Sequence, residues 1–188
     1  MTLAEQTMEE YLLKFSIPLS VNLEVQIRNI KEEYVHSVNS DDKFIWDQNE
    51  YAWFTINKLN GGTDAYCEKL AEQLSDWETY IEDTLDNIIV TPTLRQQILN
   101  CEYEWHFRRS AGQLPLINIA FGHLTAAVAK LTDGYIYTND GAWTDNIFPT
   151  TADQLLEIFL HPDKAKDAAD YDWATRCIEG LKIELASR

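Results

Sequence analysis

The stretch that decides the fold runs over residues 102–134, "EYEWHFRRSAGQLPLINIAFGHLTAAVAKLTDG". In its first part Tyr103, Trp105 and Phe107 alternate with polar residues, which is the two-residue period of a half-buried strand. From Pro115 onward, apolar residues recur every three or four positions, the spacing that places them on one face of a helix. A strand joined to an amphipathic helix predicts a helix-rich α+β fold, in which amphipathic helices pack on a small sheet.

A hairpin is expected after this helix. The helix should stop at Asp133-Gly134, because glycine and aspartate tolerate the left-handed conformation that ends many helices. "YIYTNDGAW" at 135–143 then combines a short aromatic strand, the turn residues Asn139-Asp140-Gly141 and the start of a partner strand. The sequence therefore predicts a strand-helix-hairpin unit at about 102–143.

Further helices are predicted on both sides of this unit, from helical spacing of apolar residues and from capping signals. They lie over 3–15, in the second half of 44–59 before the Gly61-Gly62 pair, from the capping box of Thr151 and Gln154, and over 168–185.

Residues 17–38 admit two interpretations. "IPLSVNLEVQI" alternates strictly between apolar and polar residues, as a strand does. Yet Leu19, Leu23 and Ile27 also fall on one helical stripe, and the chain continues through "RNIKEEY" without a turn residue. Since an isolated strand of this length would be long, the sequence favours a helix over 20–38 and leaves the strand open.

A strongly acidic amphipathic helix is predicted over 64–86, with Pro92 ending it. Lys69 is its one basic residue. Each pair of like charges four residues apart destabilises a helix by a few tenths of a kcal/mol. A basic partner would replace this repulsion with attraction. A solvated face is the alternative. The acids are Asp64, Glu68, Glu72, Asp76, Glu78, Glu82, Asp83 and Asp86.

The chain of 188 residues carries a formal net charge of −16. Its length and apolar content are those of a single domain over 1–188. Such a negative field repels nucleic-acid phosphates and anionic lipid, so neither is expected as a direct partner. The same field would steer a basic protein toward the chain, although surplus acid can also serve solubility alone.

The sequence predicts a cytoplasmic protein without metal or cofactor. Its three cysteines lie far apart without metal-ligand spacing, and no leader or membrane-spanning run is apparent. The four histidines are scattered and form no HExxH motif. An EF-hand centred on Gly141 fails, because Ile136 and Thr138 would stand where carboxylate ligands are needed.

One constellation leaves an enzyme open. A strand over 102–109 places Glu104, His106 and Arg108 on one face, where a carboxylate can orient an imidazole as a general base. The loop after it, with Ser110 and Gly112, has some ingredients of an anion pocket. No nucleophile motif accompanies them, so the sequence favours a solvated polar face and assigns no catalytic residue.

Residues 103–143 resemble the strand, helix and strand segment of small cytoplasmic bacterial immunity proteins, which protect against polymorphic or contact-delivered toxins. The resemblance covers about a fifth of the chain. It implies a binding function, neutralisation of a toxin by occlusion, and transfers no catalytic residue. The residues that carry it are Trp105, Phe107, Arg108, the helix to Leu131, Asp133-Gly134, and Asp140-Gly141-Ala142-Trp143.

These observations predict an immunity or inhibitor protein that neutralises a cognate basic toxin domain, such as a nuclease. The alternative is a small hydrolase-like enzyme acting on an anionic substrate near Glu104, His106 and Arg108, and a scaffold domain is the third possibility. The oligomeric state is left open. The predicted partner-binding residues are Glu68, Glu72, Asp76, Glu82, Asp83, Asp86, Tyr135, Tyr137, Asp140 and Trp143.

Overall fold

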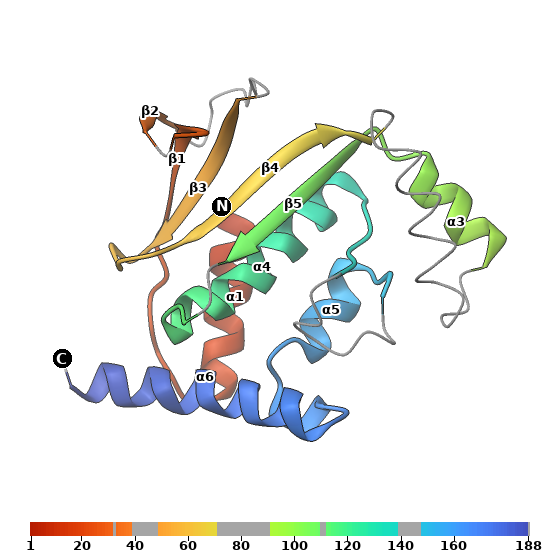
Figure 1. Cartoon of the computed structure of the whole chain (residues 1–188). Helices are drawn as coiled ribbons and strands as arrows, with labels where there is room; N and C mark the ends of the chain where they lie inside the picture. Colours follow the sequence, from red (N-terminus) through yellow and green to blue (C-terminus); the bar gives the residue numbers. More distant parts are fainter. Residues whose placement is uncertain (32, 39–48, 71–90, 110–111, 139–147, 188) are drawn as a thin grey trace.

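A five-stranded antiparallel sheet forms one layer of the molecule, in the order β2-β1-β3-β4-β5 (Figure 1). The computed structural model describes residues 1–31, 33–38, 49–70, 91–109, 112–138 and 148–187. The strands are β1 (Leu23–Asn29), β2 (Tyr34–Ser37), β3 (Glu50–Ile56), β4 (Thr63–Lys69) and β5 (Tyr103–Arg109). The helices are α1 (Thr2–Lys14), α3 (Pro92–Leu99), α4 (Pro115–Thr132), α5 (Ala152–Ile158), the short 3-10 helix η2 (Pro162–Lys164) and α6 (Ala168–Ala186).

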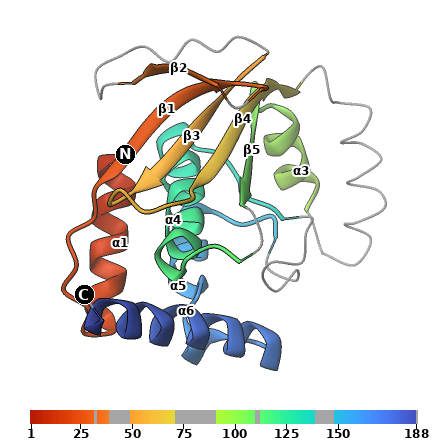
Figure 2. The same ribbon diagram turned by 60° about the vertical axis from the view of Figure 1, so that its left-hand side comes forward.

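Helices α1 and α4 lie against one face of the sheet, and α6 runs across the end of α1 (Figures 1 and 2). Alternate residues of β1 and β3, such as Val25 and Phe54, are buried against these helices. From α4, Ile117, Ile119 and Leu124 belong to the same core. The α+β class predicted from the sequence is thus confirmed.

The predicted helix over 20–38 is wrong, because this segment forms β1 and β2. The alternation of apolar residues over 17–27 was the informative signal, and the strand of seven residues, Leu23–Asn29, takes up its second half and the two residues after it. A neighbouring strand pairs with each edge of β1: Gln26 lies opposite Ser37 of β2 and opposite Trp53 of β3. Pairing on both edges satisfies the backbone groups that a lone strand would leave open.

The helix predicted in the second half of 44–59 is also wrong, since residues 50–56 form β3. The glycine pair does not end a helix but shapes the β3–β4 connection. Gly61 has φ +98°, and a Cβ on Gly62 would lie 2.2 Å from the Phe54 carbonyl oxygen. Only glycine allows this close backbone approach.

The acidic helix predicted over 64–86 is wrong at its beginning, because residues 63–69 form β4. Residues 71–90 lie outside the described part of the chain. Pro92 does not end a helix but begins α3, where the Thr91 hydroxyl accepts a hydrogen bond from the Leu94 amide (3.2 Å). Proline suits a first helical position because the amide it lacks has no partner inside the helix there.

The predicted strand over 102–109 and the helices over 3–15, after Pro115, after Thr151 and over 168–185 are confirmed with small shifts at their ends. The short strand predicted at 135–138 is not formed as a strand. Asp133 adopts a left-handed conformation (φ 53°) at the end of α4, and Thr151 and Gln154 form the capping box of α5. Downstream of α4, Ile136 pairs antiparallel with Thr150 in an isolated bridge. The predicted hairpin turn at 139–141 and the start of the partner strand at 142–143 lie outside the described residues. No described helix is long and apolar enough to cross a membrane.

Candidate functional site

The face of the sheet turned away from α1 and α4, which we call the outer face, carries polar side chains from β4 and β5. Strand register sets these residues directly opposite one another in three pairs, because paired residues of antiparallel strands project to the same face. The pairs are Asp64 with Arg108, Tyr66 with His106, and Glu68 with Glu104.

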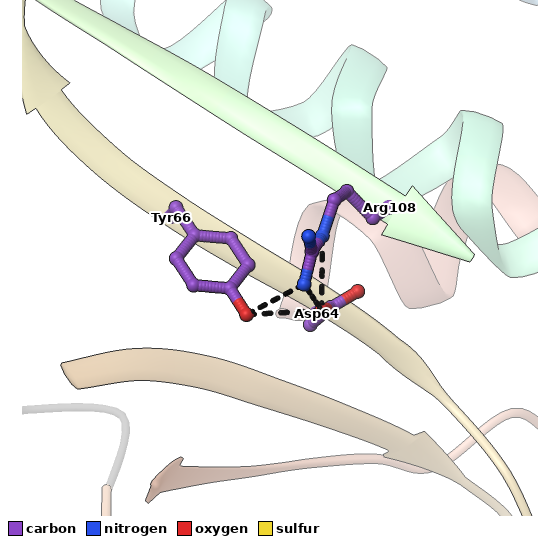
Figure 3. A network of polar contacts seen from close by, with 3 residues as sticks. All are labelled: Asp64, Tyr66 and Arg108. Carbon is purple, nitrogen blue, oxygen red and sulfur yellow. Dashed lines mark hydrogen bonds and ion pairs between the residues drawn. The ribbon is translucent and has the colours of Figure 1, made fainter. Parts of the chain in front are cut away.

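Arg108 is clamped to this face by Asp64 and Tyr66 (Figure 3). Its Nε and Nη2 donate to Asp64 Oδ2 at 3.2 and 2.7 Å, and Nη2 also donates to the Tyr66 hydroxyl at 2.7 Å. The guanidinium lies 4.6 Å from the Tyr66 ring centroid, a cation–π contact. The hydrogen bond to Asp64 raises the pKa of Arg108, while burial and then Asp64 raise the pKa of Tyr66. The arginine charge is therefore already paired within the protein.

Glu104 and His106 do contact one another, as their placement on one strand face predicts. His106 Nε2 lies 3.5 Å from Glu104 Oε1, which also accepts a short hydrogen bond from the Tyr137 hydroxyl. The Glu104 side chain is 7% exposed and that of His106 is 41% exposed. The hydrogen bond to Glu104 is the largest influence on His106 and raises its pKa, with Glu68 adding to the effect. The pair favours an imidazolium, which cannot accept a proton as a general base.

Aromatic rings and a second arginine extend the outer face across β3 and β1. Tyr51 of β3 stacks on Tyr66 with ring centroids 5.1 Å apart. Arg28 of β1 lies 4.7 Å from the centroid of Trp53. We call Arg28, Trp53, Tyr51, Tyr66 and Arg108 the aromatic stripe. Sequence reasoning missed the stripe because it treated the segments of β1, β3 and β4 as helices.

The hydroxyl groups of the two predicted hairpin tyrosines are hydrogen-bonded within the protein. The Tyr135 hydroxyl donates to Gln97 of α3 at 3.0 Å, and the Tyr137 hydroxyl donates to Glu104 of β5. Both side chains are half-buried, and both tie the chain after α4 to other elements. Glu68 is exposed on β4. The other predicted partner-binding residues lie outside the described residues: Glu72, Asp76, Glu82, Asp83, Asp86, Asp140 and Trp143.

Arg108 and Arg109, which end β5 before the loop of Ser110 and Gly112, do not converge on a common anion pocket. Arg108 projects to the outer face, whereas Arg109 projects to the helical side, where its Nη1 donates to Asn118 Oδ1 at 3.2 Å. The Arg109 guanidinium also lies over the rings of Trp173 and Phe121. Residues 110–111 of the loop fall outside the described part. Arg108 thus binds Asp64 on the outer face, while Arg109 binds Asn118 and the aromatic rings on the helical side.

Cysteine and metal chemistry find little support among the described residues. All three cysteines are free thiols, and burial raises the pKa of Cys67 and of Cys177 to about 11. Burial also raises the pKa of Cys101. Thiols with raised pKa values are poor nucleophiles at neutral pH. Within the described ranges, no three side chains of the metal-binding types converge on one point.

Comparisons with known proteins add no relative. No family model matches the chain, no curated protein matches it, and no solved structure matches it. The function must therefore be argued from the charge, the outer face and the contacts described above.

Proposed function

We propose that this protein is an immunity or inhibitor protein that binds a cognate basic toxin domain, such as a nuclease, and neutralises it by occlusion in the cytoplasm. The observation that carries the proposal is the net charge of −16, together with a segment at 71–90 that contains no lysine or arginine. Such a field attracts a cationic surface from a distance and raises the association rate. Exposed Glu68, near the end of β4, leads into this segment.

The outer face supports the proposal in a second way. Its two arginines, Arg28 and Arg108, are stacked on aromatic rings, and Arg108 is also paired with Asp64. Asp64 offsets the positive charge of Arg108, which lessens its repulsion of a basic partner. Tyrosine, tryptophan and arginine are the residue types that dominate binding energy at protein interfaces. Tyr51 is buried, so the other residues of the aromatic stripe would supply the short-range contacts after the acidic segment has steered the partner.

The test is binding to the product of the neighbouring gene, co-expressed with this protein. We expect protection of the cells and a stoichiometric complex whose association rate falls as salt is added, because screening weakens steering. Failure of both protection and complex formation would remove the proposal.

A matched pair of charge variants locates the binding segment. The triple variant E72K/D76K/E82K should slow association about tenfold or more, since steering contributes factors of about 10 to 1,000. The control E10K/E157K/D172K changes the net charge equally at exposed positions on α1, α5 and α6. Equal slowing by both variants would show that the net charge acts without a particular binding segment.

A hydrolase-like enzyme is the second candidate, favoured by the Glu104–His106 contact alone. It would use Arg108 for an anionic substrate, yet Asp64 already occupies that guanidinium. Turnover of p-nitrophenyl phosphate or p-nitrophenyl acetate that disappears in H106Q, but not in the exposed-histidine control H36Q, would support the enzyme. Turnover that is equal in both variants, or absent, would count against it.

A further inference from the structure

Two buried histidines enclose Tyr11 of α1. His123 of α4 is 2% exposed, and its ring centroid lies 5.3 Å from that of Tyr11. His161, just before η2, is 7% exposed and its ring lies 5.0 Å from Tyr11 on a nearly perpendicular plane. We call Tyr11, His123 and His161 the histidine clasp. It joins three segments that are far apart in the sequence.

Tyr11 and His123 of the clasp form hydrogen bonds on the face of α1 that packs against α4 and His161. The Tyr11 hydroxyl donates to the Leu160 carbonyl oxygen at 2.6 Å, and His123 Nδ1 lies in hydrogen-bond contact with Thr7 Oγ1 at 3.0 Å. Phe15 adds ring contacts to both Tyr11 and His161. The remaining contacts of this side are apolar, from the buried side chains of Ala4, Met8 and Leu12.

The surroundings of the clasp do not favour a charged imidazole. Lys14 of α1 and Lys164 of η2 oppose a positive charge, and of the described residues only Asp163, 3.9 Å from His161 Nδ1, favours one. Asp163 is largely exposed, so water screens its attraction. His161 Nε2 is buried without a hydrogen-bond partner. The thiol of Cys177 on α6 also faces Tyr11 and carries no charge at neutral pH.

Burial keeps both histidines neutral in the docked state. It lowers the pKa of His123 to about 3, with His161 and Lys14 adding to the effect, and it lowers the pKa of His161 in the same direction. Burial raises the pKa of Tyr11, so the phenol stays protonated throughout.

We propose that the histidine clasp is an acid-sensitive latch, which holds α1 on α4 at neutral pH and holds it progressively less tightly as the pH falls below about 6.5. A released helix would expose both imidazoles to water, where they take up protons near pH 6.5. Protons then bind the released state in preference, so docking weakens from pH 6.5 downward. At pH 5, His123 alone shifts the equilibrium toward release about thirtyfold, and His161 adds to this.

Release of α1 would also affect the sheet, because two side chains of α1 are hydrogen-bonded to the backbone at and just before the start of β1. The carboxylate of Glu5 accepts a hydrogen bond from the Leu23 amide, and that of Glu9 accepts one from the Val21 amide, both at 2.8 Å. These bonds hold the entry to β1. Undocking of α1 would therefore free the beginning of β1 and uncover the α4 surface that α1 buries.

Amide hydrogen exchange on the full-length protein tests the latch. Between pH 7 and pH 5, after correction for the intrinsic exchange rate, protection of residues 2–14 should fall at least thirtyfold while protection of 103–109 is kept. Loss of protection in both segments together, or unchanged protection of 2–14, would overturn the proposal.

Variants separate the latch from general acid sensitivity. In H123Q/H161Q the pH-dependent loss of protection should disappear, whereas H36Q on exposed β2 should behave as the wild type. If the double variant does not fold, H161F alone preserves an aromatic ring beside Tyr11 and should reduce the pH response. A wild-type pH response in H161F and H123Q/H161Q would contradict the latch.

Discussion

The guanidinium of Arg109, the last residue of β5, lies 4.7 Å from the ring centroid of Trp173 in α6. Its other neighbours are the Phe121 ring, at 5.6 Å from the centroid, and Asn118 Oδ1. No carboxylate among the described residues pairs with it. Aromatic rings and an amide therefore stabilise the charge and connect the sheet to both α4 and α6.

Removal of this contact should lower the stability of the whole protein. We expect R109M to reduce the free energy of unfolding by about 1–3 kcal/mol, because it removes a shielded cation–π contact and the hydrogen bond to Asn118. Urea denaturation measures the change. R28M is the matched control, since Arg28 lies over Trp53 at the same distance of 4.7 Å on the outer face. An equal loss in the two variants would contradict a special role for Arg109.

The Tyr137 hydroxyl should contribute more than the Tyr135 hydroxyl. Y137F removes the donor to buried Glu104 and should cost about 1–3 kcal/mol, because the carboxylate then loses a partner away from water. Y135F removes an exposed bond to Gln97 and should cost less than about 1 kcal/mol. Thermal or urea unfolding of both variants measures the difference, and equal effects would contradict it.

His106 should stabilise the protein at low pH, in the opposite sense to the clasp histidines. Its pKa is raised in the folded state, so its contribution is fully present below about pH 6.5 and is lost as the pH rises through the folded pKa. The stability difference between wild type and H106Q should shrink from pH 5.5 to pH 8. In E104Q, NMR titration should show the His106 pKa moving down. An unmoved pKa would exclude Glu104 as the cause.

Gly122 is required by the packing of α4 against the segment after α5. A Cβ at this position would lie 2.2 Å from a ring carbon of Phe159. G122A should therefore destabilise the protein by about 1–3 kcal/mol, although alanine favours helices by about 1 kcal/mol over glycine. The double variant G122A/F159L should recover part of the loss. Unfolding curves test this, and a neutral G122A would show that the ring can move aside.

The sequence predicted the elements whose signals are local. The capping box of Thr151 and the spacing that follows Pro115 place α5 and α4 correctly, because a helix forms its hydrogen bonds within itself. The helix over 20–38 was predicted wrongly because Leu19, Leu23 and Ile27 lie four apart, a spacing that satisfies both a two-residue and a helical period. Partner strands decided between the two, and they come from other parts of the chain.

The candidate site was predictable only in part for the same reason. The strand period places Glu104, His106 and Arg108 on one face, and the contact between Glu104 and His106 follows from it. The clamp on Arg108 depends on Asp64, which is 44 residues away in the sequence. Because Asp64 was predicted to lie in a helix, nothing in the sequence indicated that Arg108 lies opposite it in a sheet. The register of β4 against β5 is the missing information.

That register has a consequence for how the protein can diversify. Lys69 pairs with Tyr103, and the Leu70 amide donates to the Glu102 carbonyl at 3.1 Å, so everything between them starts and returns at one strand spacing of about 4.8 Å. The closure entropy of such an excursion grows slowly, by about 0.6 kcal/mol for each doubling of length. A change in the length of the chain between Leu70 and Glu102 therefore changes this closure entropy only slightly. Related chains could thus differ in length between β4 and β5 while the pairing of the two strands stays the same.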